Sequence, residues 1–88
     1  MLIKNKSDPL VHIRSVLERR DLNSTDKIFV VALLIEPYIQ LEFSPTEYSG
    51  YLGVSRGTLY RSMDKLSGLK ILKKYEKRYK YIIDCKLL

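Results

Sequence analysis

Apolar residues recur at spacings of three and four along the segment 9–20, which is the period of one helix face. They are Leu10, Ile13, Val16 and Leu17. Asp8 precedes them as a capping residue, and Pro9 suits the first helical position because the N–H that it lacks has no partner there. The pattern therefore predicts an amphipathic helix from Pro9 to about Arg20.

An eight-residue apolar run, Ile28 to Ile35 (IFVVALLI), follows a polar segment that can start a second helix. Ser24 or Thr25 can cap this helix, and Asp26 is favourable in its first turn. A short apolar run also suits a buried strand, but the cap and the Ala-Leu-Leu content favour a helix ending near Glu36, before a proline. A helix that is apolar on all sides must be covered on more than one of them. We expect the N-terminal helix or a second subunit to cover it.

Two helix starts separated by a glycine predict a third and a fourth helix. Ser44-Pro45-Thr46-Glu47 combines a capping serine, a proline at the first position and a glutamate three residues after the cap, which forms a capping box. This helix is expected to run from Pro45 to Leu52 and to end at Gly53 in a left-handed conformation. Ser55 caps the next helix, whose inner face carries Leu59, Met63 and Leu66. Two helices joined by Gly-Val-Ser cross steeply, as in a helix-turn-helix.

Three further segments are predicted to form strands. Gln40–Phe43 is compatible with one short strand, because its apolar residues alternate. Strand-forming residues at 73–75 and 79–83 flank Glu76-Lys77-Arg78 and predict a hairpin with a basic tip. The tip lacks Gly, Asn and Asp, so a two-residue primed turn is not expected. Alternate residues of the last segment, two of them tyrosines, form one sheet face more readily than a base-stacking surface.

Residues 24–83 resemble winged helix-turn-helix DNA-binding domains of small bacterial and phage transcriptional regulators and of plasmid and phage replication initiators. The matching residues are Ser44–Glu47, Ser49 where the helices cross, Leu52–Arg61 in the turn and recognition helix, and Leu66, Leu69, Ile71 and Leu72 before the wing. The resemblance implies a mainly α fold with a small β-hairpin. An N-terminal helix (residues 1–22), for packing or dimerisation, would precede the winged helix-turn-helix domain (residues 23–88).

Two residues depart from the pattern of this family. The family usually has glycine at the position of Lys70, whereas here Gly68 lies two residues earlier. Either Lys70 adopts a left-handed conformation, at about 1 kcal/mol, or the helix stops at Ser67. Gly57 removes a side chain that could read a base, and it allows the backbone to approach a phosphate closely.

Charge is divided unequally along the 88-residue chain. Residues 1–49 hold six Lys or Arg against seven Asp or Glu, whereas residues 50–88 hold ten against three, so the net charge of +6 comes from the second half. This asymmetry is typical of a protein with a polyanionic partner, nucleic acid first and an anionic membrane second. A basic face that is merely solvated is the alternative.

The sequence also limits the compartment. Its longest apolar run has eight residues, against about 20 needed to span a bilayer, and the first ten residues lack the apolar segment of a signal peptide. The single cysteine, Cys85, excludes an intramolecular disulfide. We therefore expect a cytoplasmic protein without a membrane partner.

No residue pattern indicates an enzyme. His12 has no second histidine or cysteine pair with which to bind a metal, and Ser55 is explained as a cap without a neighbouring base. Asp64 and Glu76 are isolated among basic residues, where solvated ion pairs explain them. No Gly-rich phosphate loop is present. We expect no catalytic residue, no metal site and no cofactor.

The expected function is sequence-specific binding of double-stranded DNA by a homodimeric transcriptional regulator, a repressor or an activator. Helix 55–67 would enter the major groove and a basic wing, residues 73–80, would contact the backbone. The expected DNA-binding residues are Thr46, Ser55, Arg56, Thr58, Tyr60, Arg61, Lys65, Lys74, Lys77, Arg78 and Lys80. Replication initiation at an origin and a winged-helix module that binds proteins stay open as alternatives, and the sequence indicates no effector.

Overall fold

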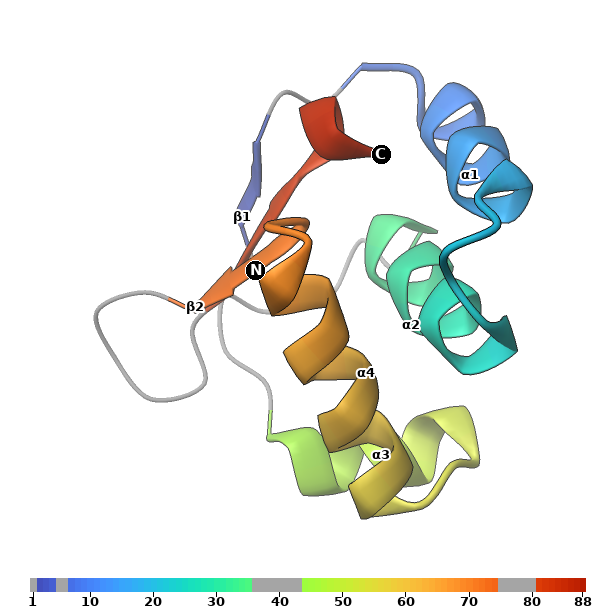
Figure 1. The fold of residues 1–88 in the computed structure, drawn as a ribbon. Helices are drawn as coiled ribbons and strands as arrows, with labels where there is room; N and C mark the ends of the chain where they lie inside the picture. Colours follow the sequence, from blue (N-terminus) through green and yellow to red (C-terminus); the bar gives the residue numbers. More distant parts are fainter. Residues whose placement is uncertain (1, 5–6, 36–43, 75–80) are drawn as a thin grey trace.

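The computed structural model describes residues 2–4, 7–35, 44–74 and 81–88, and its elements pack around one core (Figure 1). In chain order they are β1 (Leu2–Lys4), α1 (Pro9–Glu18), α2 (Ser24–Ile35), α3 (Pro45–Leu52), α4 (Arg56–Gly68), β2 (Leu72–Lys74), β3 (Tyr81–Asp84) and the 3₁₀ turn η1 (Cys85–Leu87). Helices dominate, and β2 and β3 form an antiparallel hairpin. The expected mainly α fold with a small hairpin is confirmed.

Helix α1 starts as expected but faces the core differently. Asp8 caps it by accepting a 3.0 Å hydrogen bond from the Leu10 N–H, and Pro9 is its first residue. Val16 is fully buried, whereas Leu10 and Leu17 remain 73% and 56% exposed. The prediction of one continuous inner stripe was therefore wrong. The helix is turned so that its Val16 side meets the core, and Leu17 lies about 100° around the helix from there.

Helix α2 lies between α1 and α4, as its all-round apolar sequence requires (Figure 1). Phe29, Val30 and Leu33 are fully buried, and the expected cover by the N-terminal helix is confirmed. The cap was predicted wrongly, because Asn23 takes this role and Ser24 is already helical. The Asn23 Oδ1 accepts from the Asp26 N–H at 2.9 Å, and the Asn23 N–H donates to the Asp26 carboxylate at 3.0 Å.

Helices α3 and α4 form where their start signals place them. Pro45 opens α3, but the Ser44 side chain makes no capping hydrogen bond, so the expected capping box was wrong; the Ser44 carbonyl accepts from the Tyr48 N–H at 2.9 Å. Gly53 ends α3 with φ 73°. The inner residues of α4 are buried as expected: they are Leu59, Met63 and Leu66. After α4, Lys70 has φ 64°, which is the left-handed alternative.

The sheet has three strands in the order β1-β3-β2. The expected hairpin pairs Leu72 with Ile83, and its residues 75–80 lie outside the described part of the chain, as does the expected strand at 40–43. Strand β1 was not predicted; it runs parallel to β3, with Leu2 opposite Ile82. Tyr81 is buried, 5% exposed, which confirms a structural role for this tyrosine.

The end of the chain is held against the loop between α1 and α2. Arg19 donates to the Leu87 carbonyl at 2.6 Å and forms two hydrogen bonds, of 2.9 and 2.6 Å, with the Asp21 carboxylate. This contact with Arg19 lowers the pKa of the Asp21 carboxyl to about 2. The segments before α3 and after α4 are thereby joined at two places, by the pairing of β1 with β3 and by the contact of Arg19 with Leu87.

Candidate nucleic-acid interface

Helix α3, the turn and the start of α4 occupy the end of the molecule away from the sheet (Figure 1). From there α4 runs back to the strands, where it packs against β2. The Gly53 and Val54 N–H groups close the turn by donating to the carbonyls of Gly50 and Ser49 at 3.2 and 3.0 Å. Ser49 is 5% exposed, and its hydroxyl donates to the Thr46 carbonyl at 2.8 Å. This small residue lets α3 and α4 approach each other, as expected.

A chain of hydrogen bonds orders the first two turns of α4. The Ser55 hydroxyl caps the helix by accepting from the Thr58 N–H at 3.1 Å, and it lies 2.7 Å from the Thr58 hydroxyl. The Arg61 guanidinium then donates to that Thr58 hydroxyl at 3.1 Å. Three residues that were expected to contact DNA are thus brought together. A Cβ at Gly57 would lie 3.8 Å from Arg61 Nη1, which is an ordinary van der Waals contact, so this arrangement does not require the glycine.

Other expected DNA-binding residues stand at the same end of the molecule. Arg56, Tyr60 and Thr46 are exposed, Tyr60 to 44%. Tyr51 was not singled out from the sequence, yet it is 67% exposed next to the turn and its ring packs on Tyr48 at a centroid distance of 5.6 Å. The helical period alone does not reveal it, because residue 51 lies about 80° from the middle of an inner face at 48 and 52, at the flank of that face.

Lys65 differs from the other expected contacts because it points toward α2. Its Nζ lies 2.8 Å from Oδ2 of Asp26, a residue with 0% exposure. Burial raises the pKa of the Asp26 carboxyl, but Lys65, the Ser62 hydroxyl and the Asn23 N–H together lower it further, so this pKa lies below its ordinary value. The carboxylate is therefore ionised at neutral pH and holds the ammonium group of Lys65.

The segment that was expected to form a wing, residues 73–80, is described in part. Lys74 lies in β2, and the expected contacts Lys77, Arg78 and Lys80 fall outside the described residues. Lys70 and Lys73 are exposed and line a hollow of about 250 Å³ beside the hairpin. From the sequence, Lys70 was considered only for its backbone, and Lys73 was included in the basic wing, residues 73–80, without being named as a contact.

Comparison of the chain with protein families, curated proteins and solved structures gives no match.

Among the described residues, no group of three or more His, Cys, Asp or Glu side chains is placed to hold a metal ion. The four helices of that part of the chain are all too short or too polar to cross a membrane. His12 is 8% exposed and its Nε2 accepts from the Ser7 N–H at 2.8 Å, a structural role.

Proposed function

We propose that this protein is a winged helix-turn-helix protein that binds double-stranded DNA sequence-specifically as a transcriptional regulator. The observation that carries the proposal is the start of α4, where Arg56, Tyr60 and Arg61 are exposed while the opposite side of the helix is buried. A helix presented in this way fits the major groove, in which arginine pairs with O6 and N7 of guanine. The wing, with Lys74, Lys77, Arg78 and Lys80, would meet the phosphate backbone.

Charge supports a nucleic acid over a protein as the partner. The half of the chain that holds α4 and the wing has ten Lys or Arg against three Asp or Glu. Neutralised phosphates supply most of the sequence-independent affinity of a DNA-binding protein, whereas a module that binds proteins needs no such excess. A replication initiator would share the fold and the interface, and would differ in the site that it binds.

A salt titration of the full chain with duplex DNA tests this function. If about six cations meet phosphates, the logarithm of the binding constant should fall against the logarithm of the salt concentration with a slope of about −5. A duplex selected by the protein from a random pool should bind more tightly than an unrelated duplex of equal length. Binding that is flat in salt, or absent at low salt for every duplex, would contradict the proposal.

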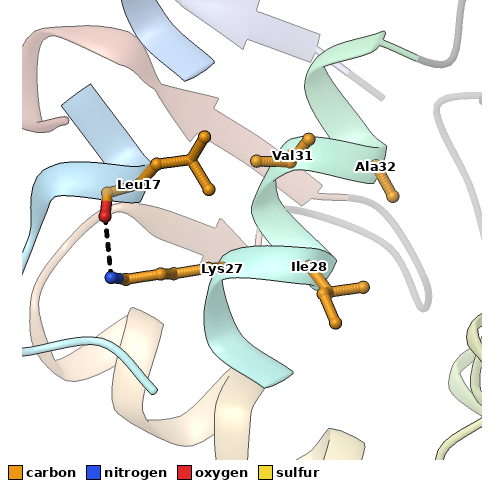
Figure 2. A pocket seen from close by; sticks show the side chains of 5 residues that line it. All are labelled: Leu17, Lys27, Ile28, Val31 and Ala32. Atoms are coloured by element: carbon orange, nitrogen blue, oxygen red, sulfur yellow. Dashed lines mark hydrogen bonds between the residues drawn. The ribbon is translucent and has the colours of Figure 1, made fainter. Parts of the chain in front are cut away.

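The proposal includes a homodimer, supported by an apolar face on α1 and α2. Leu17 and Ile28 are 56% and 52% exposed, and with Val31 and Ala32 they line a hollow of about 260 Å³. Leu17 and Val31 point toward one another across the space between the two helices (Figure 2). Lys27 borders the hollow and donates to the Leu17 carbonyl at 2.8 Å.

The same region is electrically neutral. Residues 7–35 hold four Lys or Arg and four Asp or Glu, so two copies of this face can meet without repulsion. A two-fold pairing through α1 and α2 would present two α4 helices to successive major grooves, about 34 Å apart.

A further inference from the structure

A buried ion pair joins α2 to the proposed reading helix α4. Asp26, in the first turn of α2, has none of its surface exposed. Its Oδ2 lies 2.8 Å from Nζ of Lys65 on α4 and accepts a 3.0 Å hydrogen bond from the Asn23 N–H. Ser62, also on α4, is 4% exposed, and its hydroxyl helps to lower the pKa of the same carboxyl. We call the contact of Asp26 with Lys65 the interhelix ion pair.

The interhelix ion pair constrains both helices. A buried carboxylate without a counter-charge is strongly destabilising, whereas a paired carboxylate is tolerated. Asp26 also takes part in the cap of α2, since its N–H donates to Asn23 Oδ1 at 2.9 Å. A shift of α4 along α2 would therefore leave the carboxylate unpaired at the start of α2.

The same contact binds a cation that is still partly exposed. The Lys65 side chain is 40% exposed, compared with 81% for Arg14, whose ion pair lies on the outside of α1. Arg56 and Arg61, at the start of α4, are exposed and have no such buried counter-charge among the described residues. The cations of α4 thus divide into two that are exposed without such a partner and one, Lys65, that is bound to a buried carboxylate.

We infer that Asp26 is a positioning residue for DNA reading, which fixes how α4 is presented and keeps Lys65 from the phosphates. This inference rests on the proposed DNA-binding function. It gives Lys65 an internal role in place of the phosphate contact expected from the sequence.

Asp26→Asn and Asp64→Asn form a matched pair of variants, because each removes one negative charge and Asp64 is exposed on α4. Binding of a selected duplex and of an unrelated duplex is measured for both across a salt series. Asp26→Asn releases Lys65 to a phosphate, so the slope of the logarithm of the binding constant against the logarithm of the salt concentration should steepen by about 0.9. Because α4 is then presented less precisely, the preference for the selected duplex should fall roughly tenfold. Asp64→Asn should strengthen binding to both duplexes by similar factors at an unchanged slope.

Lys65→Met tests the inference from the other side of the contact. It leaves Asp26 buried and unpaired, so the unfolding constant in urea should rise roughly 10- to 100-fold, while the salt slope stays unchanged. The double variant Asp26→Asn with Lys65→Met removes both charges, and it should recover most of the lost stability. The double variant also serves as the test if a single variant does not fold. It should show the reduced preference for the selected duplex, but its salt slope should equal that of the wild type because Lys65 is absent.

Two results together would overturn the inference and leave the proposed function standing. The salt slope would become shallower by about 0.9 in Lys65→Met, and Asp26→Asn and Asp64→Asn would show the same slope and the same preference for the selected duplex. Failure of the wild-type chain to bind any duplex would instead overturn the function, and the inference with it. The two failures are therefore distinguishable in one set of titrations.

Discussion

At the scale of single residues, Arg61 shows how a local hydrogen bond places a charge. The Arg61 guanidinium lies back along α4, where it donates to the Thr58 hydroxyl at 3.1 Å. A cation close to a helix N-terminus is disfavoured by about 0.3–1 kcal/mol, since the helix dipole is positive there. A phosphate or the electronegative edge of guanine would relieve this repulsion. The arrangement therefore favours an anionic or electronegative partner at the start of α4.

Arg61→Ala and Arg56→Ala should separate base reading from backbone binding on the same helix. Arg61 is proposed to meet a base edge, so Arg61→Ala should lower affinity for the selected duplex by roughly 1–3 kcal/mol and reduce discrimination among sites. Arg56 is proposed to meet phosphate, so Arg56→Ala should weaken all duplexes about equally and make the salt slope shallower by about 0.9. Competition titrations with single-base variants of the selected duplex measure both effects. A loss of discrimination in Arg56→Ala alone would reverse the two roles.

At the scale of elements, the turn between α3 and α4 depends on one left-handed residue. Gly53 has φ 73°, whereas Gly50 lies inside α3, and neither position has an atom within 4 Å of an added Cβ. The two glycines thus differ in backbone conformation and not in available space.

Gly53→Ala and Gly50→Ala should therefore change stability in opposite directions. Gly53→Ala should lower the free energy of unfolding by about 1–2 kcal/mol, because an L-residue is strained at this φ. Gly50→Ala should raise it by about 0.8–1 kcal/mol, because alanine favours the helix interior. Urea denaturation of the two variants beside the wild type measures both changes. Equal effects of the two substitutions would mean that α3 does not end at Gly53 in solution.

Elements with strong local signals were predictable, and those set by distant contacts were not. Asp8 with Pro9, and Gly53 with Ser55, mark helix ends through their own backbone requirements, so the sequence located these ends well. The cap of α2 was predicted wrongly because each of the three polar residues 23–25 can serve as an N-cap. The choice of Asn23 depends on its reciprocal hydrogen bonds with the buried Asp26. Strand β1 has three residues and forms only because β3 lies beside it.

The candidate site was predictable to a similar extent. The exposure of Arg56, Tyr60 and Arg61 follows from the helical period once the inner residues of α4 are assigned. The orientation of Lys65 does not follow, because on the helical wheel it stands among the outer residues. Its partner Asp26 belongs to another helix, and only the packing of α2 on α4 brings the two charges to 2.8 Å.

At the scale of the whole molecule, α2 connects two surfaces with different chemistry. It packs against α1 on one side and α4 on the other. The α1 and α2 face is apolar around Leu17 and Ile28, whereas the exposed start of α4 carries arginines. A partner bound to the first surface would thus be linked to the proposed reading helix α4 through α2 and Asp26.

Leu17→Glu with Ile28→Glu should convert the proposed dimer into a folded monomer. Both side chains are more than half exposed, so the substitutions should change the free energy of unfolding of one subunit by only about 0.5 kcal/mol, while two buried carboxylates per subunit would prevent association. Leu69→Glu, at a residue that is 37% exposed beyond α4, adds one carboxylate outside the proposed interface and should leave the dimer intact. Sedimentation at tens of micromolar without DNA measures the oligomeric state of each variant.

The same variants predict a change in the DNA that is bound. The wild-type dimer should prefer inverted repeats whose half-sites lie about one helical turn apart, since two symmetric α4 helices then meet equivalent grooves. The Leu17→Glu with Ile28→Glu variant should lose this preference and bind single and paired half-sites with equal affinity per half-site, because each subunit still carries its own α4. Selection of duplexes by both proteins, followed by titration of one and two half-sites, measures the difference. A wild-type chain that sediments as a monomer and shows no preference for inverted repeats would end the dimer proposal, and the apolar face would then belong to another partner.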